Sequence, residues 1–81
     1  MKILYAELLE NNVQTKLESK KLTTGTSEEF IEALVLLCNG LDVDVPLWTH
    51  KEEKMLEKKN EVVIPVDPEK NIVMKIYTHT P

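Results

Sequence analysis

Four residues of LDVDVPLWTHKEE, residues 41–53, have the side chains of a cation or small-ligand site. Asp42 and Asp44 alternate with two valines, so an extended backbone would place both carboxylates on one side, where they could share a hard cation. His50 and Glu53 lie one helical turn apart. Zinc needs three or four ligands, so further residues would have to converge on folding. The alternative is a solvated strand face followed by a solvated helix end, which we favour.

Cys38 is the only cysteine, so no intrachain disulfide can form. It could in principle form a nucleophilic pair with His50 or His79. However, it lies in ALVLLCNG, on the apolar side of the last turn of a predicted helix, whereas thiolate nucleophiles favour helix N-termini or cationic neighbours. We therefore expect a buried structural thiol. From the sequence we therefore predict that the protein is not an enzyme and that it has neither catalytic residues nor a cofactor.

The stretch TTGTS, residues 23–27, precedes a predicted helix and could contact a phosphate through backbone amides. Glu28 and Glu29 follow in the first turn and would repel an anion. The glycine-rich fingerprint and the lysine of a phosphate loop are both missing. This stretch is therefore expected to be a helix cap.

Composition indicates one globular domain over residues 1–81. The chain is 42% hydrophobic and 30% charged, and its net charge of −4 argues against nucleic-acid binding through Lys16, Lys20 and Lys21. The longest apolar run, residues 33–38, is too short to cross a bilayer, and the first residues lack the apolar core of a signal peptide. We expect a cytoplasmic protein without membrane or nucleic-acid partners.

Two hairpins are predicted, one at each end of the chain. Residues 2–9 and 13–20 flank Asn11-Asn12, and Asn tolerates the positive φ of a tight hairpin turn. The second run alternates strictly and has one polar face. Residues 61–66 and 71–79 flank Asp67-Pro68, which suits a type I turn. Pro65 lacks an amide proton and therefore predicts an edge strand.

Two helices are predicted between the hairpins. Thr26 and Glu29 have the spacing of a capping box, and Asn39-Gly40 is a stop signal, so the first helix is expected over residues 27–39. Its last turns are apolar nearly all round, so Val35 and Leu36 need cover from elsewhere. The second helix, residues 50–59, is polar, and Trp48 is expected to anchor it to the core.

These elements predict an α+β fold in the order β-β-α-α-β-β. The four strands would form one antiparallel sheet with the first helix across one face. The other face would remain uncovered, and an apolar patch of that kind usually marks a contact site. Whether the two hairpins pair within one chain or between two chains is open at this stage. The apolar residues expected on the uncovered face are Ile3, Tyr5, Leu9, Val63, Val73 and Tyr77.

With its stretch LCNGLDVDVPLWTHKEEK, the chain resembles a group of small uncharacterised bacterial proteins. They share a Leu-rich helix, a Leu-Asp-x-x-x-Pro-Leu-Trp-like connector, a charged stretch and a closing hairpin. The likeness spans residues 36–58. The group has no known activity, so the resemblance assigns no functional residue and implies only a self-contained cytoplasmic domain.

The sequence therefore predicts a small protein-interaction module that forms a homodimer or binds another protein. An 81-residue chain has a small core and gains buried area by pairing. The alternative is a ligand- or divalent-metal-binding protein that uses Asp42, Asp44, His50 and Glu53. The candidate contact residues are Val35, Leu36, Trp48, Tyr5 and Tyr77.

Overall fold

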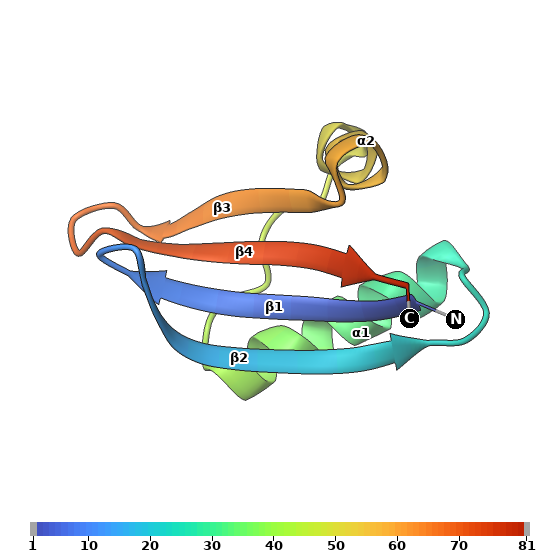
Figure 1. Cartoon of the computed structure of the whole chain (residues 1–81), viewed down its shortest axis with the longest axis horizontal. Coiled ribbons are helices and arrows are strands. Elements are labelled where there is room, and N and C mark those ends of the chain that lie inside the picture. The colour runs from blue at the N-terminus through green and yellow to red at the C-terminus, as the bar shows by residue number, and fades with distance from the viewer. Residues whose placement is uncertain (1, 81) are drawn as a thin grey trace.

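The computed structural model of the chain describes residues 2–80 and confirms the predicted α+β fold. The strands form one antiparallel sheet in the order β2-β1-β4-β3. Helix α1 lies behind the sheet in Figure 1, and α2 lies beside the outer end of β3. The elements are β1 Lys2–Glu10, β2 Val13–Leu22, α1 Ser27–Leu41, α2 His50–Lys59, β3 Glu61–Asp67 and β4 Ile72–His79.

The first hairpin turns at Asn11 and Asn12, as predicted. Both residues have positive φ, 51° and 66°, which matches the twist of the flanking strands. The pairing of β1 with β2 is regular from Lys2 to Leu8 and then shifts by one residue at a bulge. The regular part of β2 is therefore the part farthest from the turn.

The central strands β1 and β4 pair within one chain, which settles the pairing of the two hairpins. Ala6 lies opposite Ile76, and both side chains are fully buried. Side chains alternate between the two faces of a sheet, so Leu4 and Met74 share this buried face. Helix α1 covers it and completes the core with Ala33, Leu34, Leu37, Cys38 and Leu41.

Helix α1 begins as predicted but ends later. The Thr26 hydroxyl accepts a hydrogen bond from the Glu29 amide at 3.2 Å. The predicted stop at Asn39-Gly40 is wrong, because the helix continues through Gly40 to Leu41. Asp42 takes the left-handed conformation instead, with φ 59°, and its amide donates to the Asn39 carbonyl. The reason lies in packing, because Leu41 is buried only if the helix continues.

Gly40 lies where α1 passes close to β2. A Cβ atom at this position would lie 3.1 Å from Cδ of Glu18, an exposed side chain. Lys16 Nζ also lies 3.5 Å from the Leu41 carbonyl oxygen. Lys16 and Glu18 therefore face the C-terminal end of α1, and Leu17 points to the opposite, uncovered face of the sheet.

The second hairpin and α2 follow the prediction closely. Asp67 accepts hydrogen bonds from the amides of Glu69 and Lys70 in the turn, and β3 is an edge strand that contains Pro65. Helix α2 spans the predicted residues and buries Leu56. Glu52 and Glu53 stand in its first turn and two lysines in its last, which complements the helix dipole.

Candidate functional site

Neither helix of residues 2–80 covers the face of the sheet opposite α1, and we call this face the open face. In Figure 1 it points toward the reader. The strand registers place the apolar residues predicted for this face together on it, and they add Leu17. Its apolar and aromatic members are Ile3, Tyr5, Leu9, Leu17, Val63, Val73 and Tyr77.

Two tyrosines stack at the middle of the open face. Tyr5 on β1 lies opposite Tyr77 on β4, with ring centroids 5.0 Å apart and planes inclined by 9°. Both rings are half-buried by their neighbours, and partial burial raises the pKa of the Tyr77 hydroxyl above its ordinary value. The pair forms a rigid aromatic platform of the kind that is enriched in protein interfaces.

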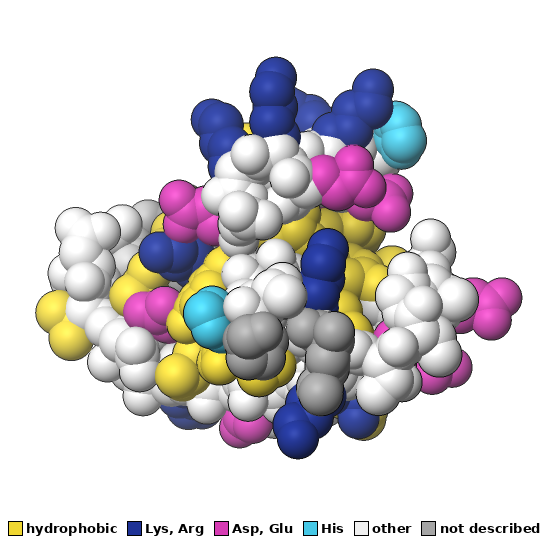
Figure 2. Space-filling view, turned by 45° about the vertical axis from the view of Figure 1, so that its right-hand side comes forward, with side chains coloured by type: hydrophobic (Ala, Val, Ile, Leu, Met, Phe, Trp, Pro, Cys, Tyr) yellow, Lys and Arg dark blue, Asp and Glu magenta, His cyan; other side chains and the backbone are white. Residues whose placement is uncertain are grey.

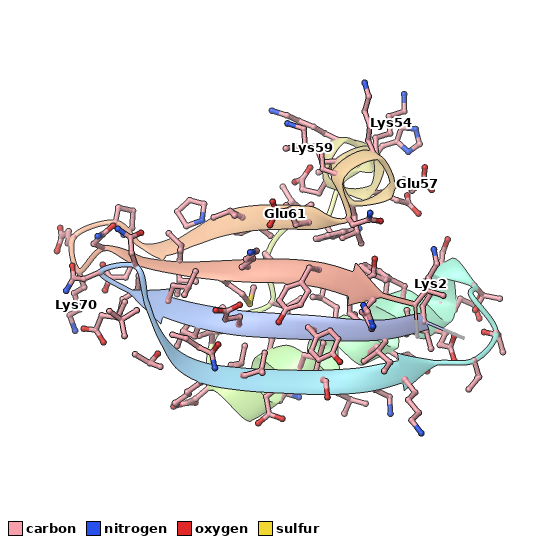
Figure 3. The ribbon with its side chains drawn as sticks, viewed as in Figure 1. Lys2, Lys54, Glu57, Lys59, Glu61 and Lys70 are labelled. Atoms are coloured by element: carbon pink, nitrogen blue, oxygen red, sulfur yellow. The ribbon has the colours of Figure 1, made fainter. Side chains whose placement is uncertain are left out.

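A row of alternating charges crosses the open face beside this platform. Lys75 Nζ lies 3.1 Å from Glu61 Oε2, and Glu7 is the direct cross-strand neighbour of Lys75 on β1. Figure 3 shows Glu61 on the exposed side of β3. The Glu61 carboxylate holds the pKa of Lys75 above its ordinary value. Lys75 also stands 5.5 Å from the centroid of the Tyr77 ring. Glu7, Lys75 and Glu61 therefore form a row of alternating charges across β1, β4 and β3.

The outer surface of α1 carries two further exposed apolar residues. Val35 is 36% exposed and Leu36 is 53% exposed, so neither is covered by the chain itself. They are successive residues and therefore lie about 100° apart around the helix. Leu36 stands one turn before Gly40, on the side of α1 that faces β2. Of the two, only Leu36 borders the sheet edge formed by β2.

The Trp48 side chain is partly buried and packs against the core. Its ring packs against Phe30, with centroids 5.1 Å apart, and contacts the core cluster. Its indole nitrogen is buried without a hydrogen-bond partner among the described residues. These contacts fit the role of an anchor between α1 and the connector that leads to α2.

The four residues of the predicted ligand site do not form one cluster. Asp42 caps α1 in the left-handed conformation, so the extended segment that would align it with Asp44 is not formed. His50 Nδ1 lies 3.9 Å from Glu53 Oε2 at the start of α2, and the His50 side chain is 79% exposed. Among residues 2–80, no three His, Cys, Asp or Glu side chains are grouped to hold a metal ion.

Cys38 is fully buried in the core beneath α1. Burial raises the pKa of its thiol, which disfavours the nucleophilic thiolate. This position fits the expected structural role of the residue.

The loop before α1 holds an anion from its own chain. The Glu29 carboxylate accepts hydrogen bonds from the amides of Thr23, Thr24 and Gly25 at 2.8–2.9 Å. These bonds, the one from the Thr23 amide first, lower the pKa of Glu29 to about 2. The amides that a phosphate would need are therefore occupied, which supports the helix-cap interpretation of this stretch.

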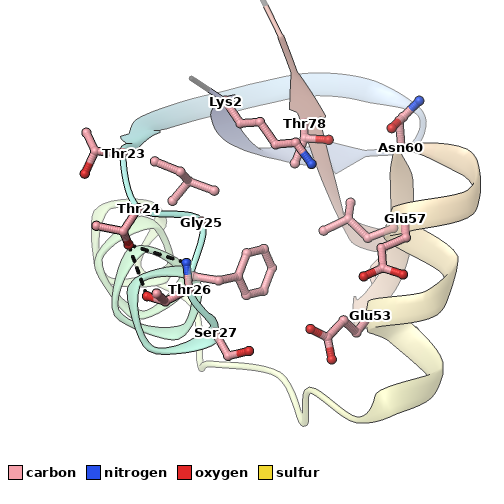
Figure 4. A pocket seen from close by; sticks show the side chains of 13 residues that line it. Lys2, Thr23, Thr24, Gly25, Thr26, Ser27, Glu53, Glu57, Asn60 and Thr78 are labelled. Atoms are coloured by element: carbon pink, nitrogen blue, oxygen red, sulfur yellow. Dashed lines mark hydrogen bonds between the residues drawn. The ribbon is translucent and has the colours of Figure 1, made fainter.

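A cleft of about 390 Å³ opens between this loop and α2. In Figure 2, which is turned by 45° from the view of Figure 1, apolar side chains gather in the hollow between α2 and the body of the molecule. Phe30 and Leu56 contribute to its apolar lining. Figure 4 shows the carboxylates of Glu53 and Glu57 pointing into the cleft from α2, with the Lys2 side chain reaching in from β1. Of the predicted ligand residues, only Glu53 lines this cleft.

The sequence prediction did not include Leu17 or the charged row among the functional residues. The alternation of β2 placed Leu17 on the face opposite Lys16 and Glu18, and this was the available signal. The neighbours of Lys75 depend on the pairing of strands that are distant in sequence, so no local pattern indicates them.

Comparison with family models, with curated proteins and with solved structures finds no match to this chain. The resemblance over residues 36–58 therefore stays a prediction. No helix within residues 2–80 has the length and apolarity needed to cross a membrane.

Proposed function

We propose that this protein is an interaction module that associates with a second copy of itself through the apolar surface left uncovered by α1. The main support for this proposal is the open face, because one helix covers only one side of a four-stranded sheet. Leu17 and Val63 stand 44% and 55% exposed on it, beside the tyrosine pair. Apolar patches of this kind usually mark contact sites on small proteins.

The total accessible surface supports the same proposal. A compact monomer of this mass exposes about 5,000 Å². This chain exposes 5574 Å², roughly a tenth more. The excess of roughly 570 Å² is smaller than the area of about 800 Å² that each partner buries in a standard interface. The chain therefore exposes somewhat more surface than a compact monomer of its mass.

Lysine substitutions at exposed apolar positions test this function. Leu17→Lys and Leu36→Lys should each weaken self-association about tenfold or more, because an exposed leucine that becomes buried contributes roughly 1.5–3 kcal/mol. Leu47→Lys is the matched control, since Leu47 is 83% exposed on the connector, away from the sheet. Dissociation constants from analytical ultracentrifugation compare the three variants. Equal effects of all three, or no effect at Leu17 and Leu36, would contradict the proposal.

The cleft favours a second candidate function, the binding of a small charged ligand. Its apolar lining is flanked by two carboxylates and one ammonium group, an arrangement that suits a zwitterion with an apolar part. Thermal melts with and without free amino acids would test it, because a specific ligand raises the midpoint. A midpoint shift that persists in the Glu53→Gln/Glu57→Gln variant would argue against this use of the cleft.

A further inference from the structure

The outer edge of β2 is one of the two free edges of the sheet. In the described chain β2 pairs only with β1, and nine of its ten residues are exposed. Its unpaired backbone groups can pair with another strand where the charges of its lysines are compensated. The opposite edge, β3, is a poorer template, because Pro65 lacks an amide proton and α2 lies at its end, whereas β2 is regular over residues 16–22.

Two exposed leucines flank this edge on opposite faces of the sheet. Leu17 lies on the open face, and Leu36 lies on the α1 side, one turn before the contact of Gly40 with Glu18. The two exposed apolar regions, the open face and the outer side of α1, therefore meet along β2. A partner strand added here would contact both.

Two-fold symmetry leaves few registers for such pairing. In an antiparallel pair of strands, the side chains of two directly opposite residues lie on the same face of the sheet. If both α1 helices are to lie on one face, the two-fold axis must therefore pass through a residue of β2, and that residue is paired with its own copy. An axis at any charged residue of β2 pairs that residue with its own copy, which applies to Lys16, Glu18, Lys20 and Lys21. Like charges placed directly opposite each other are destabilising, which excludes these four registers.

Among the uncharged positions, axes at residues 13–15 lie at the bulge, and an axis at Leu22 lies at the last residue of β2. Leu17 and Ser19 are left, and the bulge distinguishes these two registers. An axis at Leu17 would run the pairing across residues 14 and 15, where the register of β2 shifts. An axis at Ser19 uses only the regular stretch, residues 16–22. It also sets Glu18 opposite the second copy's Lys20 twice, once on each side of the axis.

We propose that a second copy of this chain pairs antiparallel with β2 in a two-fold register centred on Ser19. The result is a continuous eight-stranded sheet with both α1 helices on one face and Leu36 of each copy near the axis. The self-association proposed above is the premise, and of the open face this pairing contacts the β2 side, at Leu17. The regular stretch of β2 selects the register, because an axis at Leu17 would also set Glu18 opposite a lysine, Lys16, but would cross the bulge.

Charge exchange tests the register. Glu18→Lys and Lys20→Glu each place two like-charge pairs beside the axis and should weaken the dimer about tenfold or more. The double variant Glu18→Lys/Lys20→Glu restores both pairs and should return to within about threefold of the unmodified protein. Glu28→Lys on α1 and Lys58→Glu on α2 carry the same changes of net charge and serve as controls. A double variant as weak as the singles would overturn the proposed register.

Cysteine cross-linking tests it independently. Directly paired residues have Cα atoms about 4.5–5.5 Å apart, within disulfide range. Ser19→Cys should therefore form a covalent dimer with oxidised glutathione. Leu17→Cys should not, because the two copies of residue 17 would lie about 13 Å apart along the strands. The unmodified protein, whose Cys38 is buried, is the control for background.

The outcomes separate this inference from the proposed function. The Ser19 register would be overturned if the dimer cross-links through Leu17→Cys, or through neither cysteine variant, and its dissociation constant does not change with the charge exchanges. Self-association itself would still stand in that case. A chain that stays monomeric at every concentration would remove self-association itself. Rescue by the double variant together with cross-linking at Ser19 establishes the register.

Discussion

Tyr5 and Tyr77 stack nearly parallel on the open face, with their ring centroids 5.0 Å apart. The pair joins strands from opposite ends of the chain, because β1 and β4 are the two central strands of the sheet. Stacked aromatic pairs contribute about 0.5–1.5 kcal/mol beyond the area that they bury. This pair therefore ties the two hairpins together on the open face.

A double-mutant cycle measures this coupling. Tyr5→Ala and Tyr77→Ala, alone and together, should give an interaction free energy of about 0.5–1.5 kcal/mol in urea unfolding at one fixed protein concentration. The cycle of Tyr5→Ala with Val63→Ala is the control, since these side chains lie on strands that do not pair. Additive effects of the two tyrosine substitutions would show that the rings stack without stabilising the sheet.

The Glu29 cap should make stability depend on acid pH. Its pKa is lowered from 4.5 to about 2 in the folded chain, so the charged carboxylate stabilises the fold above about pH 4.5. This contribution should decline as the pH falls from about 4.5 toward about 2. Glu29→Gln should lower stability at pH 7 and flatten the profile in this window. Glu28→Gln, which removes the same charge from the same turn, is the control.

The Glu29 profile is measured by urea unfolding at pH values between 2 and 7, with a matched series for each variant. Direct NMR titration of the Glu29 carboxylate gives the pKa independently. A midpoint near 4.5 for this group would contradict the contacts with the loop amides.

Several of these features could be predicted from the sequence, because their signals are local. The turn at Asn11-Asn12 needs positive φ, and the Thr26–Glu29 spacing specifies where α1 begins. Alternation along β1 and β4 assigned Tyr5 and Tyr77 to the same face. The fold class followed from the order of these elements.

Long-range packing explains what could not be predicted. Gly40 has the type and position of a helix stop, but the helix continues through it to the buried Leu41, and Gly40 lies close to the Glu18 side chain of β2. This contact depends on how α1 crosses β2, which local patterns do not encode. Asp42 was expected in an extended segment and instead caps the longer helix. Because Asp42 caps the helix, the extended segment that would align its carboxylate with that of Asp44 is not formed.

Gly40→Ala tests whether the contact with Glu18 is adjustable. Alanine in a helix is favoured over glycine by about 0.8–1.0 kcal/mol. The new Cβ would lie 3.1 Å from Glu18 Cδ, and this exposed side chain can rotate away. We expect a net stabilisation of at most about 1 kcal/mol by urea unfolding. Asn39→Ala, in the same turn, is the control. Destabilisation by Gly40→Ala alone would mean that Glu18 is held in place.

Cys38 should be protected from thiol reagents in the folded chain. The side chain is fully buried and the pKa of its thiol is raised, so labelling requires opening of the fold. The rate of labelling by Ellman's reagent at pH 8 should be on the order of a thousandfold lower than in concentrated urea. Rapid labelling without denaturant would show that α1 detaches from the sheet.

Self-association through the surface that α1 leaves uncovered is the central claim, and sedimentation equilibrium tests it most directly. The unmodified chain should show a concentration-dependent mass that approaches twice the 9.3 kDa of one copy. A mass that stays at 9.3 kDa up to millimolar protein would contradict the claim.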